Sequence, residues 1–258
     1  SELSPYVQST PLSEFSKSIS IYLNDLENFD MRTIHPKYGF ISERKYILRE
    51  VIRLKDMEID IWNEKLSTNI KSAFIPNTRS QIYFLEFNNF FKDLPELLYK
   101  SRNGRFYKDN EEKFSFFVES SLETLKKLFW VPDVIIFNDW QTSILPLLLQ
   151  KRMKKDSWFK NIKTVFFLHN NSDQFNFSNQ IFEKLNLDYN KRKKTQDLME
   201  LAINNSDFTF VFNDLKSNKI KSLLKDNRHK IVGPLDNLKS SEKLEIFNTV
   251  SKEVSSLI

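Results

Sequence analysis

Two short apolar runs constrain the fold of this chain most strongly. Residues 134–137 read Val-Ile-Ile-Phe, and residues 164–168 read Thr-Val-Phe-Phe-Leu. Continuous apolar runs of this length are typical of strands that are buried on both faces, as in a parallel sheet. Between them, the apolar residues 144–149 supply one face of a helix. The three segments therefore predict a strand–helix–strand unit with parallel strands.

Polar side chains follow both runs at the point where each predicted strand ends. Asn138 and Asp139 come directly after the first run, and His169 and Asn170 come directly after the second. Ligands of open α/β sheets bind at the carboxyl ends of the strands, so these four residues are the candidates for a small-molecule site. A purely structural role is the alternative. Asp139 would then cap a helix, and His169 would satisfy backbone groups of a loop.

Strands alternate with helices through the second half of the chain. The spacing of apolar residues predicts helices at residues 11–28, 111–129, 195–204, 215–224 and 238–257, with Leu244, Phe247, Val250 and Val254 facing inward on the last. Further strands are predicted at residues 31–35, 57–62, 69–75, 81–87, 207–212 and 230–232. We expect an α/β fold in one domain over residues 1–258. Its sheet would be Rossmann-like, doubly wound and mainly parallel, with residues 41–87 as an antiparallel elaboration.

Composition excludes several classes of function. The chain has no cysteine and only three histidines, so we expect no disulfide, no thiol catalysis, no metal site and no cofactor. It contains no run of about 18 apolar residues, so no membrane span is expected. The net charge of +5 comes partly from two basic runs, residues 151–155 and 191–194. We interpret these runs as solvated surface, and therefore expect no nucleic-acid partner. The absence of cysteine fits a reducing compartment, so we expect a cytoplasmic location.

The central segment also resembles a known family. Residues 132–149, PDVIIFNDWQTSILPLLL, and residues 163–170, KTVFFLHN, resemble the N-terminal domain of bacterial glycogen and starch synthases, glycosyltransferase family 5. Residues 1–6, 35–39 and 107–117 continue the likeness in the same order. The resemblance implies the N-terminal, acceptor-side half of a GT-B glycosyltransferase.

The resemblance also implies ligands and roles for the candidate residues. Asp139 aligns with an aspartate that contacts the sugar, and His169 aligns with a histidine that contacts the transferred glucose. Gln141 stands where the family has a histidine. The implied ligands are α-glucan and ADP-glucose.

One loop departs from the family pattern. The family reads K-x-G-G-L after its first strand, and this loop contacts the phosphates of the nucleotide sugar. The aligned residues here are Gln8, Ser9, Thr10, Pro11 and Leu12. The lysine and both glycines are lost, so side chains stand where bare backbone should approach the phosphates, and the proline lacks an N–H donor. We expect a degenerate phosphate loop and a relaxed or changed function.

Length is the second departure. The synthases have a second domain that carries most nucleotide-sugar contacts, and this chain ends where that domain would start. Its three glycines could not build a second glycine-rich nucleotide site. We therefore expect a glycogen/starch-synthase-like protein that cannot transfer glucose on its own. Two alternatives stay open: a missing half supplied by a protein partner or a homo-oligomer, and a non-enzymatic glucan-binding or regulatory module. The natural protein could also extend before residue 1.

Overall fold

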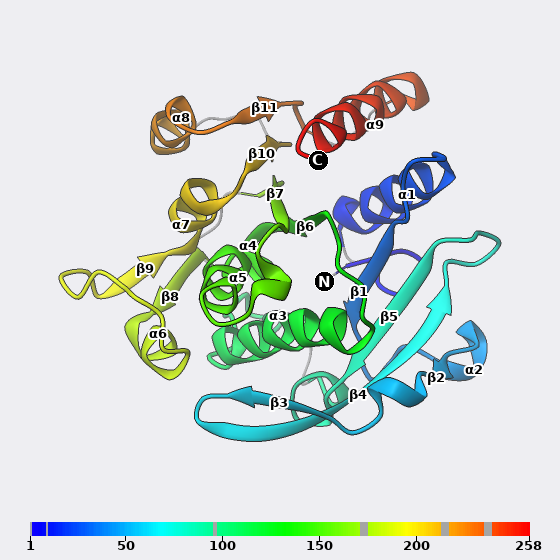
Figure 1. Cartoon of the computed structure of the whole chain (residues 1–258), viewed down its shortest axis with the longest axis horizontal. Coiled ribbons are helices and arrows are strands. Elements are labelled where there is room, and N and C mark those ends of the chain that lie inside the picture. Colours follow the sequence, from blue (N-terminus) through cyan, green and yellow to red (C-terminus); the bar gives the residue numbers. More distant parts are fainter. Residues whose placement is uncertain (1, 9, 95–96, 171–174, 213–216, 235–238) are drawn as a thin grey trace. The chain divides into compact units, whose positions relative to one another are not determined.

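The computed structural model describes residues 2–8, 10–94, 97–170, 175–212, 217–234 and 239–258. The chain divides into two compact units, Ser1–Leu128 and Phe129–Ile258, and each is described by itself (Figure 1). The expected single domain over residues 1–258 stays a prediction.

The first unit contains a mixed five-stranded sheet. Its strands are β1 (Arg32–Pro36), β2 (Arg49–Glu50), β3 (Met57–Ile61), β4 (Glu64–Phe74) and β5 (Gln81–Glu86). The order is β1-β5-β4-β2, and β3 also pairs with β4. Only the β1–β5 pair is parallel, and β2, β3 and β5 run antiparallel to β4. The antiparallel elaboration expected for residues 41–87 is therefore confirmed.

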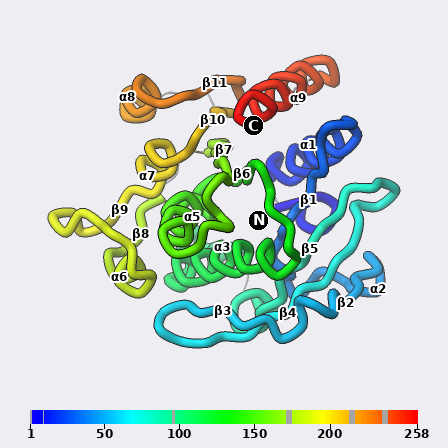
Figure 2. Tube along the Cα trace, viewed as in Figure 1, coloured from blue at the N-terminus to red at the C-terminus, as the bar shows by residue number. Residues whose placement is uncertain are grey.

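Strand β4 is longer than the sequence predicts and forms a hairpin with β3 (Figure 2). Strand β4 begins at Glu64 rather than at residue 69. Trp62 and Asn63 form the turn, and both have a positive φ, 57° and 60°. Left-handed backbone at both central residues is what a tight hairpin turn requires. Four of the five residues 64–68 are polar, which concealed the start of this strand.

Two long helices accompany this sheet. Helix α1 (Pro11–Asp25) begins with proline in its first turn, which suits the fixed φ of that residue. Helix α3 (Asn110–Lys127) ends two residues before the predicted end. Three short helical segments were not predicted: α2 (Glu43–Tyr46), η1 (Ile52–Leu54) and the π-helical η2 (Asn88–Lys92).

The second unit is built on a four-stranded parallel sheet, which confirms the predicted fold class. The strands β6 (Val134–Asn138), β7 (Lys163–Leu168), β10 (Phe208–Val211) and β11 (His229–Ile231) lie in the order β11-β10-β7-β6. All three pairs are parallel. Residues 164–168 of β7 are buried, as predicted. Residues 134–136 of β6 are only half-buried, so its expected burial on both faces is wrong. The reason is that β6 ends the strand order and is covered less completely than the inner strand β7.

Six α-helices and one 3₁₀ helix in the described part of this unit connect or flank the strands: α4 (Asp139–Thr142), α5 (Leu145–Met153), η3 (Ser157–Phe159), α6 (Asn179–Lys184), α7 (Leu198–Asn205), α8 (Asn218–Lys225) and α9 (Ser240–Ser255). Residues 215 and 216, predicted to start α8, lie outside the described residues. Leu244 of α9 is 50% exposed, so its inward orientation is wrong. It lies six residues before the buried Val250, and a helix turns about 100° per residue, so the two side chains face about 120° apart.

The predicted helix at residues 195–204 begins three residues late. Residues Thr195–Asp197 form β9, which pairs antiparallel with β8 (Asn176–Ser178). The side chain of Asp197 accepts a hydrogen bond from the backbone N–H of Glu200 and so caps α7. A capping side chain and a neighbouring strand together fix the helix start at Leu198.

Candidate functional site

The four candidate residues lie together at one edge of the parallel sheet. Strands β6 and β7 are neighbours, and Asn138 pairs in register with Phe167. Asn138 and Asp139 therefore leave the sheet beside His169 and Asn170, at the carboxyl ends of both strands. We call these four residues the carboxyl-edge site.

Asp139 connects the end of β6 to the loop after β7 through hydrogen bonds. Its Oδ1 accepts hydrogen bonds from the backbone N–H groups of His169 (2.7 Å) and Asn170 (3.1 Å). Its Oδ2 accepts from the side-chain amide of Asn170 at 3.3 Å. The residue has a φ of +47°, a left-handed conformation that aspartate tolerates better than most residues. Asp139 is the first residue of α4, whose cap position is Asn138, and its carboxylate accepts hydrogen bonds from the loop after β7.

His169 is held as a neutral ring. Its Nε2 lies 3.0 Å from Oδ1 of Asn138, and because an amide oxygen only accepts, Nε2 carries the proton in this arrangement. The ring stacks on Phe212 with centroids 4.6 Å apart and planes at 13°. Burial lowers the pKa of His169 from 6.5 to about 3. At neutral pH the imidazole is therefore uncharged, with its lone pair on Nδ1.

Two residues that contact the carboxyl-edge site, Thr142 and Phe212, were not predicted. The hydroxyl of Thr142 donates to the backbone oxygen of Asn138 (2.7 Å) and accepts from its N–H (2.9 Å), which fixes the end of β6. Phe212 directly follows β10, whose Val211 pairs with Leu168. A signal for Phe212 existed, because the strand predicted at residues 207–212 ends there. To infer from this signal that Phe212 reaches His169, the order of the strands also had to be known.

Apart from the buried carboxylate of Asp139, this site presents neutral hydrogen-bonding groups. The carboxylate of Asp139 is 2% exposed and already accepts three hydrogen bonds, so it is a poor base and a poor metal ligand. His169 adds no positive charge, and Asn170 is exposed. Within the described ranges, no three metal-binding side chains cluster anywhere. Such groups suit the hydroxyls of an uncharged ligand better than a phosphate.

The predicted phosphate loop lies in the first unit. Gln8 is exposed, and its Nε2 donates to Oγ of Ser4 at 3.0 Å. The hydroxyl of Thr10 donates to a carboxylate oxygen of Glu2 at 2.7 Å, and Pro11 is the first residue of α1. Ser9 lies outside the described residues. Glu2 is 4% exposed, so a protein carboxylate is buried next to the start of this helix.

Comparisons with known proteins identify the family to which this chain belongs. The starch synthase catalytic domain family matches residues 1–216, and the chain belongs to this family. In the part of the chain that the structure describes, no helix is both long and apolar enough to cross a membrane.

Individual relatives are glycogen synthases. The chain is 37% identical over 184 residues to the glycogen synthase of Pelodictyon phaeoclathratiforme. It is 38% identical over 192 residues to that of Chlorobium luteolum. Each match covers 71% of this chain but only 37% of the relative, so the chain spans well under half of their length.

A solved structure shares the fold. It is the catalytic domain of Starch Synthase IV from Arabidopsis thaliana, bound to ADP and acarbose. The TM-score is 0.74 at 16% identity, over 93% of this chain and 51% of the other. The predicted kinship with the N-terminal half of a GT-B glycosyltransferase is confirmed at the level of the fold.

Proposed function

We propose that this polypeptide binds α-glucan at the carboxyl-edge site and does not transfer glucose by itself. One observation carries the proposal: Asp139 holds the loop of His169 and Asn170 in place while His169 stays neutral. A prearranged set of donors and acceptors without a positive charge recognises sugar hydroxyls with little loss of side-chain entropy on binding.

The same set favours glucan over ADP-glucose as the ligand. A diphosphate is bound best by cations, helix N-termini and free backbone N–H groups. The carboxyl-edge site contains no lysine or arginine, and Asp139 already occupies the N–H groups of His169 and Asn170. Two relatives by name are glycogen synthases, which supports a glucan as the polymer in question.

The loop before α1 supports the second half of the proposal. In place of a lysine it has Gln8, which carries no charge, and Pro11 supplies no N–H group. The hydroxyl of Thr10 is already bound to the buried carboxylate of Glu2. A negative charge at this position repels a phosphate rather than binding it. Without a phosphate site, the electrostatic stabilisation that glucose transfer requires is incomplete.

The test is calorimetric titration with maltoheptaose and, separately, with ADP-glucose. We expect saturable heat with maltoheptaose and about tenfold weaker binding in His169→Ala, a loss of about 1.4 kcal/mol. The matched control is His229→Ala, because His229 is an exposed histidine on β11 of the same unit. It should bind as the unaltered chain does. Equal weakening in both variants, or no heat with maltoheptaose, would overturn the glucan proposal and direct attention to a protein partner.

The absence of transfer is tested separately. Release of ADP from ADP-glucose in the presence of maltoheptaose should not exceed the background without protein. Turnover by the isolated chain, retained at high dilution, would contradict the proposal. Turnover that disappears on dilution would also contradict it, and would favour a second copy that completes the site.

A further inference from the structure

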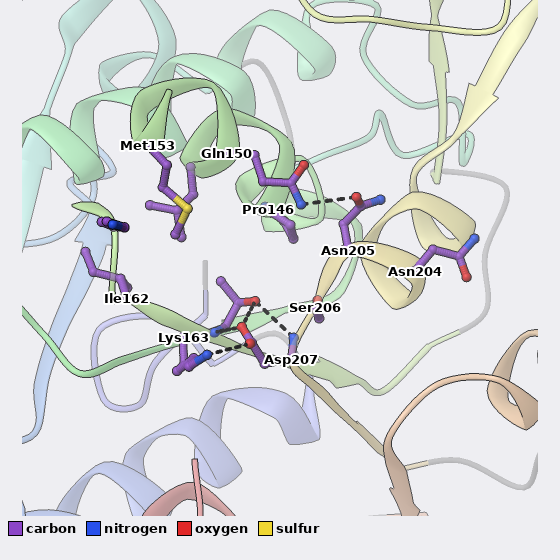
Figure 3. Close-up of a pocket in the computed structure, with 12 residues that line it drawn as sticks. Pro146, Gln150, Met153, Ile162, Lys163, Asn204, Asn205, Ser206 and Asp207 are labelled. Carbon is purple, nitrogen blue, oxygen red and sulfur yellow. Dashed lines mark hydrogen bonds and ion pairs between the residues drawn. The ribbon is translucent and has the colours of Figure 1, made fainter. Parts of the chain in front are cut away.

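A cavity of about 390 Å³ lies in the second unit, at the sheet edge opposite the carboxyl-edge site. Its wall is formed by α5, the end of α7 and the segments that lead into β7 and β10 (Figure 3). Lys163 and Thr164 begin β7, and Asp207 directly precedes β10, so this is the amino edge of the sheet. The volume is within the range of small-molecule sites. We call it the amino-edge cavity.

The apolar part of the lining is aliphatic. Pro146, Leu149 and Ile162 are buried, and Met153 is half-buried beside them. No aromatic ring occurs among the described residues that line the cavity. Sugar rings and nucleobases are bound most often against aromatic faces. A glucan or a nucleotide therefore fits this lining poorly, and the apolar surface that it does offer is aliphatic.

The polar part of the lining has a net positive charge. Asp207 accepts hydrogen bonds from the backbone N–H (2.8 Å) and the hydroxyl (3.1 Å) of Thr164, and its other oxygen lies 3.4 Å from Nζ of Lys163. The negative charge of Asp207 is thereby balanced by the positive charge of Lys163. Lys160 is exposed at the cavity and forms no ion pair with any described residue. One positive charge is left over for a ligand.

The opposite wall is held by an amide pair. Nε2 of Gln150 donates to Oδ1 of Asn205 at 3.1 Å, and Nδ2 of Asn205 donates to the backbone oxygen of Leu201 at 2.8 Å. Figure 3 shows this bridge between α5 and α7 on the side of the cavity away from Ile162. It joins the two helices at the surface and leaves Oε1 of Gln150 able to accept a hydrogen bond.

We propose that the amino-edge cavity binds a small organic anion with an aliphatic body, such as a short-chain carboxylate. The chain of the ligand packs against the half-buried Met153, above the buried Leu149 and Ile162, and its anionic group lies near the exposed Lys160. The proposal is independent of the glucan site, because the two lie at opposite edges of the same sheet.

Octanoate is the probe for this site, with octanol as its uncharged counterpart. We expect saturable binding of octanoate on the order of millimolar affinity and much weaker binding of octanol. In a nitrogen-15 correlation spectrum, octanoate should shift the backbone signals of Ile162, Lys163 and Asn205 and leave that of Asn170 in place. Maltoheptaose should not displace it.

Two variants and one control decide the outcome. Lys160→Gln should weaken octanoate binding by about threefold to fivefold, the effect of one exposed ion pair. Met153→Trp should fill the cavity and abolish binding, while a preserved thermal unfolding transition shows that the chain still folds. Lys155→Gln is the matched control, because Lys155 is exposed just after α5 and does not line the cavity. No saturable binding, equal affinity for octanol, or equal weakening by Lys155→Gln would overturn the proposal.

Discussion

Two buried carboxylates, Glu2 in the first unit and Asp139 in the second, lie next to predicted ligand loops and act differently. Glu2 accepts hydrogen bonds from two side chains, the hydroxyls of Thr10 (2.7 Å) and Tyr99 (3.2 Å). Asp139 accepts two hydrogen bonds from backbone N–H groups. Side-chain donors are lost by a single substitution, but backbone donors are not. Asp139 therefore organises a loop, whereas Glu2 only occupies the start of a helix.

Among the substitutions, replacing Asp139 should have the largest effect. Asp139→Ala leaves the N–H groups of His169 and Asn170 without their acceptor and places alanine at a φ of +47°. We expect a loss of about 3 kcal/mol in the free energy of unfolding, measured by urea denaturation. Asp139→Asn keeps an acceptor oxygen and tolerates this φ, so it should lose about half as much. Equal losses in the two variants would mean that the two backbone hydrogen bonds contribute little.

The second prediction concerns how the free energy of unfolding depends on pH through the buried His169. Burial lowers the pKa of His169 to about 3, whereas the unfolded chain holds it near 6.5. Between these values the unfolded state binds a proton that the folded state does not. Stability is therefore fully present above pH 6.5 and falls by about 1.4 kcal/mol per pH unit inside the window, until the loss is complete near pH 3.

The measurement is a difference between variants, because carboxylates also titrate in this range. His169→Gln should show a shallower decline of unfolding free energy than the unaltered chain between pH 6 and pH 4. His229→Gln, at an exposed position, should decline as the unaltered chain does. Identical slopes for the unaltered chain and His169→Gln would show that His169 titrates normally and is not desolvated.

Much of the carboxyl-edge site could be predicted from the sequence. Two apolar runs followed by polar pairs were enough to bring Asp139 and His169 to the same edge, because parallel strands share their carboxyl ends. The role of Asp139 was not predictable in the same way. Aspartate is common both as a helix cap and in left-handed backbone, and only the partner loop after β7 decides between the two.

Strand order limited the sequence analysis in the same way. Phe212 was placed at the end of a predicted strand, but its stack on His169 depends on β10 lying beside β7. The polar start of β4 at Glu64 carries no apolar alternation, so only its pairing with β3 reveals it. Local pattern predicts elements, whereas contacts between distant elements give residues their roles.

Phe212 offers a smaller perturbation of the same site. Phe212→Leu removes the ring that stacks on His169 at 4.6 Å but keeps an apolar side chain. We expect a loss of about 1 kcal/mol in unfolding free energy. The pKa of His169 should rise toward 6.5 as water reaches the ring. Proton NMR titration of the histidine Cε1 signals measures this, with His229 as an internal reference. An unchanged pKa would show that Phe212 does not exclude water from the ring.

The Glu2 network should respond more weakly and nearly additively. Thr10→Val and Tyr99→Phe each remove one donor to the carboxylate and leave the other in place. We expect a loss of just under 1 kcal/mol for each, because the remaining hydroxyl and entering water still solvate Glu2. A double-mutant cycle by urea denaturation tests this. A loss in either single variant as large as that of Asp139→Ala would contradict the contrast between side-chain and backbone donors.

The smallest expected effect is none at all. The triple variant Gln8→Lys, Thr10→Gly and Pro11→Gly restores the lysine and both glycines of the family loop, and it also frees Glu2 from Thr10. It should gain at most a weak affinity for ADP-glucose in calorimetry, because Glu2 still places a negative charge beside α1. ADP release in the presence of maltoheptaose should stay at background, since a loop that binds phosphate only weakly beside the carboxylate of Glu2 does not supply the electrostatic stabilisation that glucose transfer requires. Turnover by the triple variant would show that the loop alone had silenced transfer, and that the carboxyl-edge site is catalytic rather than only glucan-binding.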